Sequence, residues 1–237
     1  MSSTAIIVGA SSQIAQAIIH ELINDTSINQ IISISRSPLS FPGCVENIQC
    51  DYQEAHIKDV CHNLNLKSPI SRVFICNGVL HDETKRPERK IEQITEKALT
   101  EILHSNTIVP TLWLKHLTPL LKSDTPCKVA LFSARIGSIS DNQLGGWYSY
   151  RASKAALNML VQTFAIELAR RAKNVKLLAF HPGTTDTPLS KPFQRSVPEG
   201  KLFTPEFVAT QLLTLLDTLE PDGSASYMDW NHQSIEW

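Results

Sequence analysis

Short apolar runs alternate with segments of helical spacing along the chain. The first run, residues 5–8, is followed by residues 13–24, where apolar side chains recur at helical intervals, and then by a second run at 30–35. This strand, helix, strand order is typical of a parallel sheet with helices on both faces. Five further strands are predicted at residues 47–50, 72–76, 129–132, 175–180 and 226–228. The pattern therefore predicts an α/β fold with seven strands.

Longer helical patterns follow in the second half of the chain. Residues 91–121 predict one or two helices broken or bent near Pro110, and residues 152–170 carry apolar side chains on one helical face. The sequence T-P-E at 204–206 predicts a helix start, because it combines an N-cap residue, a proline in the first helical position and an acid in the first turn.

The segment 184–203 differs from its surroundings. It contains Pro188, Pro192, Pro198 and Gly200 with little periodicity, and a long irregular loop in a compact domain usually serves a function. We expect it to be a substrate lid. No repeat, low-complexity tract or change of composition marks a boundary, so a single domain is predicted for residues 1–237.

Composition and charge exclude several classes of protein. Of the 237 residues, 42% are hydrophobic and 19% charged, and the formal net charge of −1 gives no sign of a nucleic-acid partner. The densest basic stretch, residues 85–90, follows Asp82 and Glu83, which favours a solvated loop. No apolar run reaches about 18 residues and the N-terminus has no basic leader, so we expect a cytoplasmic protein without a membrane partner.

The cysteines form an odd set of five without a C-x-x-C pair. Neither a disulfide framework nor a zinc site is indicated, no metal is expected, and the thiols are predicted to be reduced. They are Cys44, Cys50, Cys61, Cys76 and Cys127.

The first candidate for chemistry is the turn at residues 9–14, which leaves a predicted strand and opens a helix. Gly9 allows a tight turn, and the amides that follow it, with the hydroxyls of Ser11 and Ser12, can hold a pyrophosphate at the positive helix end. A strand-turn-helix with small residues is at least as often only a tight connection. The turn alone does not decide between these interpretations.

The second candidate is Y-R-A-S-K at 150–154, where Tyr150 and Lys154 share one face of a helix. A phenol with a pKa of about 10 is a poor acid at neutral pH. A nearby ammonium favours the phenolate and brings the group into working range. Most tyrosine–lysine pairs with this spacing are solvent-facing side chains that occur together by chance. Neighbouring motifs therefore have to decide between a chance pair and a catalytic pair.

Several motifs occur together in an order and spacing that resemble the short-chain dehydrogenases/reductases, and the resemblance covers the whole chain. They are Gly9-Ala10-Ser11-Ser12, Asn77-Gly78, Asn106, Tyr150-Arg151-Ala152-Ser153-Lys154 and Pro182-Gly183. Within the family, a second set resembles the C-factor-like branch. It comprises Ser133-x-Arg135-x-Gly137-Ser138, Gly145-Gly146-Trp147-Tyr148, Ala155-Ala156-Leu157-Asn158, His181-Pro182-Gly183-Thr184, the run at 189–194 and Trp237.

The resemblance implies a Rossmann-type, doubly wound sheet of seven parallel strands and hydride transfer between a nicotinamide and a carbonyl or alcohol. It implies that Tyr150 protonates the carbonyl oxygen and that Lys154 lowers the pKa of Tyr150 and binds the nicotinamide ribose. Asn106 would hold a water that links Lys154 to solvent. These three residues, with Ser133, form the predicted catalytic set.

The resemblance also implies a cofactor site at the strand ends. Asn77-Gly78 stands where the family has N-A-G and would pass close under the cofactor, although a glycine in a turn is the simpler explanation. Pro182-Gly183, with Thr185 and Thr187, would contact the carboxamide and fix the ring face. The pyrophosphate would lie against Gly9, Ser11, Ser12, Gln13 and Ile14.

Two departures from the family pattern change the expectation. Gln13 and Ala15 occupy the second and third glycine positions, so Gln13 should weaken cofactor binding or alter the turn, whereas Ala15 is the milder change. Ala134 replaces the catalytic serine. Losing such a donor can cost about 10²-fold or more in rate, and we expect Ser133 or Ser138 to supply the hydroxyl in an active enzyme.

Cofactor choice depends on the end of the second strand. It reads Ser35-Arg36-Ser37, without the acid by which NAD enzymes hold the ribose diol. A guanidinium and hydroxyls suit a 2′-phosphate, so NADP(H) is predicted, with NAD(H) as the alternative if Arg36 is only an exposed loop residue. Asp51 and Tyr52 would flank the adenine, although Asp51 is equally placed to cap a helix.

Two functions stay open on the sequence. The leading one is an NADPH-dependent carbonyl reductase with a small carbonyl or alcohol substrate. The other is a cofactor-binding signalling or regulatory protein with little turnover, which Ala134 and the C-factor resemblance both admit. The family resemblance also implies a homo-oligomer, a dimer or tetramer, paired through the helices predicted at 91–121 and 152–170.

Overall fold

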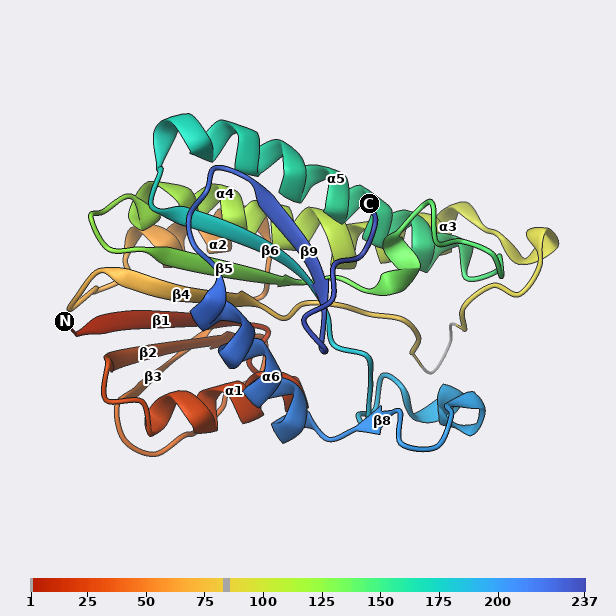
Figure 1. The fold of residues 1–237 in the computed structure, drawn as a ribbon, viewed down its shortest axis with the longest axis horizontal. Helices are drawn as coiled ribbons and strands as arrows, with labels where there is room; N and C mark the ends of the chain where they lie inside the picture. The colour runs from red at the N-terminus through yellow and green to blue at the C-terminus, as the bar shows by residue number, and fades with distance from the viewer. Residues whose placement is uncertain (1, 83–85) are drawn as a thin grey trace.

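The computed structural model describes residues 2–82 and 86–237. Seven parallel strands form one sheet in the order β3-β2-β1-β4-β5-β6-β9, which confirms the predicted doubly wound fold (Figure 1). The strands are β1 Ser3–Val8, β2 Ile28–Ser35, β3 Val45–Gln49, β4 Ile70–Ile75, β5 Cys127–Phe132, β6 Val175–His181 and β9 Ala225–Asp229. Because β1 pairs with β2 on one side and β4 on the other, the strand order reverses there and the connecting loops diverge.

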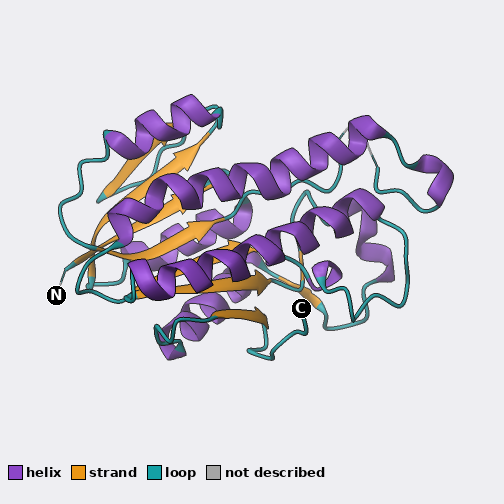
Figure 2. Ribbon diagram, turned by 90° about the horizontal axis from the view of Figure 1, so that it is seen from above, coloured by secondary structure: helices purple, strands orange, loops and turns teal. Residues whose placement is uncertain are grey.

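Helices cover both faces of the sheet, and Figure 2 shows the long helices lying across the strands. They are α1 Gln13–Ile23, α2 Glu54–His62, α3 Glu96–Leu103, α4 Val109–Leu121, α5 Tyr148–Arg171 and α6 Pro205–Thr218. Successive strand residues point to opposite faces. In β1, Ile6 and Val8 share a core with α2, α4 and α5, whereas Ala5 and Ile7 share one with α1 and α6. β1 is therefore buried along its whole length, as in a sheet covered on both faces.

Residues 91–121 form separate helical pieces rather than one rod. A π-helical turn, His104–Ile108, joins α3 to α4, and Pro110 follows near the start of α4. A proline lacks the N–H that a continuous helix needs, so the predicted break near Pro110 is confirmed. Asn106 lies in the π-turn, a geometry that often occurs at functional sites.

One helix boundary and one additional helix differ from the sequence-based expectation. α5 begins at Tyr148, earlier than the predicted start at 152. α2 was not predicted, because it is short and buries few of its residues, Ile57, Val60 and Cys61. The predicted cap of α6 is confirmed, since the Thr204 hydroxyl accepts the Phe207 N–H at 3.2 Å.

The segment 184–203 contains short elements of its own. β7 Thr184–Thr185 pairs with β8 Leu202–Phe203, and a 3₁₀ helix, Lys191–Ser196, lies between them. In Figure 1 this light blue segment projects beyond the main sheet. Lys85, at the start of the basic stretch, lies outside the described residues. Among the residues described, no helix has the length and apolar character needed to span a membrane.

Candidate active site

A cleft of about 550 Å³ lies where the strand order reverses, and it holds most of the predicted cofactor residues. Cavities of this size accommodate small-molecule cofactors. The predicted residues that line it are Gly9, Ser11, Ser12, Gln13, Ile14, Arg36, Asp51, Tyr52, Asn77, Gly78, Ser133, Tyr150, Lys154, Pro182 and Thr187. Gly183 and Thr185 line a neighbouring pocket instead.

Gly9 and Ser12 shape one end of the cleft. Gly9 has a φ of 79°, and a Cβ there would lie 3.0 Å from the carbonyl carbon of Cys76, so glycine lets the chain turn this close to the end of β4. The Ser12 hydroxyl caps α1 by accepting the Ala15 N–H at 3.2 Å. The first turn of α1 carries no acidic residue. The positive end of this helix therefore suits a pyrophosphate.

The substituted glycine positions differ in their surroundings. Gln13 is exposed and lines the cleft, whereas Ala15 is fully buried in the core with α6. Asn77 Oδ1 is buried and has no hydrogen-bond partner among the described residues. A buried acceptor without a partner is costly, and a ligand with donor groups would supply one. The cleft therefore fits a dinucleotide. Gln13 is the part of its wall that departs from the glycine pattern of the family.

Arg36, unlike Ser35, lines the cleft with an exposed cationic side chain. Ser35 is 3% exposed and its hydroxyl donates to the carbonyl oxygen of Ser37, so the predicted contact of Ser35 with a phosphate is corrected. The Arg36 guanidinium carbon lies 5.9 Å from the centre of the Tyr52 ring. The Tyr52 hydroxyl donates to the Ile34 carbonyl at 3.3 Å, which fixes the ring beside Arg36.

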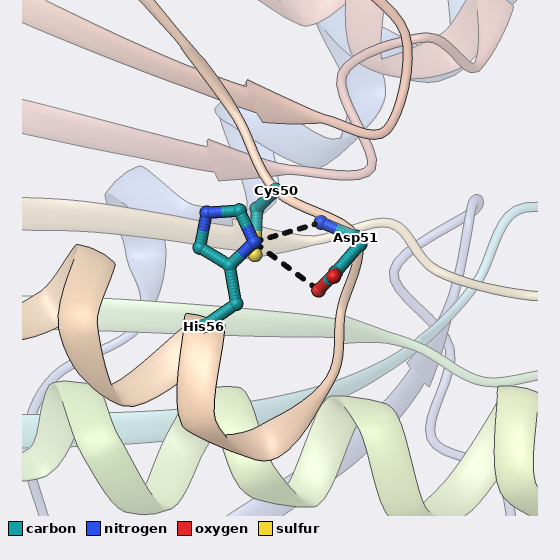
Figure 3. A group of neighbouring side chains, drawn as sticks. All are labelled: Cys50, Asp51 and His56. Carbon is teal, nitrogen blue, oxygen red and sulfur yellow. Dashed lines mark hydrogen bonds and ion pairs between the residues drawn. The ribbon is translucent and has the colours of Figure 1, made fainter.

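Asp51 lies beside His56 and Cys50 at the start of α2 (Figure 3). Its carboxylate accepts the Gln53 N–H at 2.8 Å and lies 3.2 Å from His56 Nδ1. The cap residue of α2 is Gln53, so the interpretation of Asp51 as the helix cap is wrong. Burial raises the pKa of the Cys50 thiol, which opposes the thiolate that a metal requires, and we assign no metal to this group.

Tyr150, Lys154 and Asn106 come together where α5 meets the π-turn. Lys154 Nζ donates to the Phe132 carbonyl at 2.7 Å and lies 5.7 Å from the centre of the Tyr150 ring. Asn106 Oδ1 accepts the Val79 N–H at 2.6 Å, and its Nδ2 donates to the Val79 carbonyl at 2.8 Å. Asn106 Nδ2 also donates to the Ser153 hydroxyl at 3.0 Å. Asn106 therefore ties the loop after β4 to the catalytic helix.

The pKa of Tyr150 departs from the expectation. Burial, with a smaller contribution from Tyr227, raises the pKa of Tyr150 above its usual range. Burial lowers the pKa of Lys154 to about 8. Lys154 was expected to lower the pKa of Tyr150, but its ammonium is directed at a backbone carbonyl, and burial of the phenol raises that pKa instead. Tyr150 is consequently a protonated donor at neutral pH.

The hydroxyl expected to replace the missing serine is engaged elsewhere. Ser133 is 4% exposed and donates to Asn158 Oδ1 at 2.6 Å. Ser138 is 2% exposed, and its hydroxyl oxygen lies 3.3 Å from that of Ser140. A proton already donated to Asn158 is not available to a carbonyl, so this geometry counts against Ser133 as the donor. Ala134 itself lines the pocket beside Tyr150.

A second pocket, of about 1130 Å³, adjoins the cleft, and we call it the substrate pocket. Tyr150, Pro182 and Thr187 line both cavities and so mark their boundary. The loop at 79–95 and the segment 184–203 supply most of the remaining wall. Besides Tyr150, its wall contains the aromatic side chains of Trp147, Phe193, Phe203 and Trp230.

Glu88 is a residue of this region that the sequence did not reveal. It is 5% exposed, and its carboxylate accepts the Ser149 N–H at 3.2 Å and the Ser149 hydroxyl. Its backbone carbonyl accepts the Trp147 N–H at 2.5 Å. Trp147 precedes α5 with a φ of 52° and provides no side-chain cap. Glu88 therefore caps α5 from a distant loop, just before Tyr150.

His181 also lines the substrate pocket, at the end of β6. Burial and the positive charge of Arg135 lower its pKa to about 4, although Asp229 opposes the shift. The imidazole is therefore neutral at physiological pH. Any net charge of the pocket comes from other residues.

Comparison with known proteins agrees with this geometry. Residues 3–197 match the short chain dehydrogenase family. The chain belongs to the short chain dehydrogenases. The chain is 36% identical over 132 residues to 1-hydroxy-2-glutathionyl-2-methyl-3-butene dehydrogenase of Rhodococcus sp. (strain AD45), which covers 56% of this chain and about half, 55%, of that protein.

Two other relatives bear on the branch of this short chain dehydrogenase. It is 29% identical to benzil reductase ((S)-benzoin forming) of Bacillus cereus, over 94% of this chain and 98% of that one. It is 30% identical to C-signal of Myxococcus xanthus, over 56% of this chain and 74% of that one. The predicted similarity to the C-factor-like branch is thus confirmed.

Solved structures share the fold of this short chain dehydrogenase. Carbonyl reductase Sniffer of D. melanogaster superposes with a TM-score of 0.85 at 16% identity, covering 100% of both chains. The NADPH-bound carbonyl reductase from chicken fatty liver gives 0.84 at 21% identity, covering 100% of this chain and 99% of that one. These structures show the shared fold, and the family match over residues 3–197 makes the chain an oxidoreductase of a family that uses NAD(P)H on carbonyl and alcohol groups.

Proposed function

We propose that this protein is an NADP(H)-dependent carbonyl reductase. The observation that carries the proposal is the position of Tyr150, which lines both the cofactor cleft and the substrate pocket. A proton donor at that boundary can reach a carbonyl that faces the cofactor. The names of the Bacillus cereus relative and of both solved structures describe reductases, which supports the same direction of reaction.

The chain supplies the proton and the binding groups for this reaction. The nicotinamide, when bound, supplies the hydride. Tyr150 carries its proton at neutral pH and donates it to the carbonyl oxygen. Lys154 lies close enough to favour the phenolate left behind, and with a pKa of about 8 its charge is lost as the pH rises through that value. Reduction should therefore decline above about pH 8.

The preference for NADP(H) rests on Arg36. Ser35, at the end of β2, is followed by Arg36, so no carboxylate stands there to hold a ribose diol. The exposed guanidinium on the cleft wall suits a 2′-phosphate. Pro182 and Thr187, at the boundary of the two cavities, would orient the carboxamide. The alternative, NAD(H), requires Arg36 to contribute nothing to binding.

We also propose that the segment 184–203 closes over the bound cofactor and substrate. The segment lines the substrate pocket. His81 Nε2 lies 3.2 and 3.0 Å from the Pro188 and Leu189 carbonyl oxygens, so the segment contacts the loop that carries His81. Cofactor should slow amide hydrogen exchange across the segment. Unchanged exchange would rule out closure.

A homo-oligomer paired through α4 and α5 is a further part of the proposal. Met159 and Ile166 on α5 are 67% and 61% exposed, and Ile108 before α4 is 46% exposed. Residues 159 and 166 lie on one helix face, and a second copy of the chain would bury them. Sedimentation of the wild type against Ile166→Lys tests this, with a monomeric wild type as the contrary result.

The main test is NADPH consumption with a panel of aromatic and aliphatic aldehydes and ketones. We expect turnover that Tyr150→Phe reduces by about 10²-fold or more, with NADPH affinity retained, because only the proton donor is lost. NADPH binding without turnover on any carbonyl, with Tyr150→Phe indistinguishable, would instead favour a signalling or regulatory protein. The C-signal relative and Ala134 make that the second candidate.

A further inference from the structure

Positive side chains surround the mouth of the substrate pocket. Arg86 and Arg89 come from the loop at 79–95, and Arg195 and Lys201 come from the segment 184–203. All four are exposed. The whole chain has a formal net charge of −1, so this is a local concentration of positive charge rather than a property of the protein surface at large.

No acid in the pocket neutralises these charges. Among the described residues that line it, Glu88 is the one carboxylate, and both of its oxygens are bound to Ser149. Arg89 and Arg195 make no ion pair with a described residue. The nearby Asp186 is 3.6 Å from Lys191 and accepts from Gln194 at 2.8 Å, so it is already engaged. His181 is neutral. The guanidinium groups are consequently available to a ligand.

The deeper wall has a different character. Trp147 packs on Phe193 with ring centres 4.9 Å apart, and it lies 6.2 Å from the ring of Tyr150. Phe203 and Trp230, which also line the pocket, pack with ring centres 4.2 Å apart. The pocket therefore has an aromatic interior next to the proton donor and a cationic mouth on both covering segments.

We propose that the substrate carries its carbonyl on an aromatic or other apolar group and bears a carboxylate at the far end. The apolar part would pack on Trp147 and Phe193 with the carbonyl at Tyr150. The carboxylate would meet Arg89 and Arg195, which reach it from opposite loops and suit the two oxygens of a carboxylate. This inference rests on the proposed carbonyl reduction.

The test compares 4-formylbenzoate with its neutral methyl ester as substrates, with NADPH, at low and high salt. We expect kcat/KM for the acid to exceed that for the ester by about tenfold at low salt and the advantage to shrink at high salt, because exposed charges are screened. Arg89→Gln and Arg195→Gln should each lower the acid-to-ester ratio about threefold, mainly through KM for the acid. Arg170→Gln, an exposed arginine at the far end of α5, is the control and should leave the ratio unchanged.

Failure of this inference is distinguishable from failure of the proposed function. Equal kcat/KM for acid and ester, or ratios that Arg89→Gln and Arg195→Gln leave unchanged, would overturn the carboxylate assignment while carbonyl reduction stands. If neither aldehyde is reduced, calorimetric binding of 4-(hydroxymethyl)benzoate and its methyl ester to the NADP⁺-loaded protein decides. Tighter binding of the acid, lost in the Arg89→Gln/Arg195→Gln variant, supports the inference without turnover, and equal binding rejects it.

Discussion

The cofactor cleft and the substrate pocket meet at Tyr150, but different parts of the chain form their walls. The cleft is formed by strand ends and tight turns, where a Cβ added at Gly9 would lie 3.0–3.1 Å from backbone atoms of Cys76 and Asn77. The substrate pocket is formed by long side chains from two loops, and at its Gly183 a Cβ would meet the rings of Phe203 and Trp230 at 2.8 Å. Backbone contacts cannot readjust as side chains can. Under the proposed function, the rigid sheet would bind the cofactor and replaceable loop residues would select the substrate.

Gly9→Ala alters the rigid backbone wall of the cofactor cleft and should have the largest effect. The substitution adds a Cβ 3.0 Å from a backbone carbon and forces a non-glycine residue to a φ of 79°. We expect a loss of about 2–3 kcal/mol in the free energy of unfolding and about 100-fold in NADPH affinity. Urea denaturation and fluorescence titration measure the two quantities.

Gly43→Ala is the matched control, because Gly43 has a φ of 76° but no atom within 4 Å of an added Cβ. It should cost only the conformational part, about 1 kcal/mol. If both variants lose the same stability and affinity, the close approach at Gly9 is not what shapes the cleft.

Arg36→Ala sharpens the comparison within the cleft, because it separates the contribution of the Arg36 guanidinium from that of the backbone wall. A charge-assisted contact of about 2 kcal/mol predicts about a thirtyfold loss of NADPH affinity with little change for NADH. Lys58→Ala, which removes an exposed cation on α2, is the control. Similar NADPH and NADH affinities in the unmodified protein would contradict the assignment of Arg36.

Ala134→Ser examines the boundary between the two cavities. It restores a hydroxyl beside Tyr150, and we expect kcat/KM to rise about tenfold for a carbonyl substrate, because the developing oxyanion gains a second donor. Ser133→Ala should change the rate little, since that hydroxyl is bound to Asn158. A loss of about 10²-fold in kcat/KM in Ser133→Ala or Ser138→Ala would mean that substrate binding reorients that serine. Its hydroxyl would then be the donor that the sequence-based analysis expects.

Glu88→Gln should have the smallest effect, because it keeps the size of the capping side chain while it removes the charge and one of the two acceptor oxygens. We expect a decrease of about 1 kcal/mol in the free energy of unfolding and a fall in kcat of about threefold. Glu92→Gln, at an exposed position of the same loop, is the control. An unchanged melting temperature together with an unchanged kcat would show that the cap neither stabilises α5 nor positions Tyr150.

Much of the fold was predictable because it depends on local patterns. The period of apolar residues determines strands and helices, and the turn after β1 needs only Gly9 and the residues that follow it. Tyr150 and Lys154 share a face simply because they are four positions apart on one helix. The short α2 escaped prediction because a helix that buries only Ile57, Val60 and Cys61 leaves a weak apolar signal.

The sequence by itself determined the parallel sheet, the cofactor turn and the Tyr150–Lys154 pair, since each follows from residues within a few positions of one another. Only the tertiary structure decided that Ser133 donates to Asn158, that Glu88 caps α5 and that Arg89 and Arg195 share one pocket mouth. The physical reason is that these arrangements join residues far apart along the chain. Local periodicity carries no information about which loops meet, or about which buried polar groups satisfy one another when the core closes.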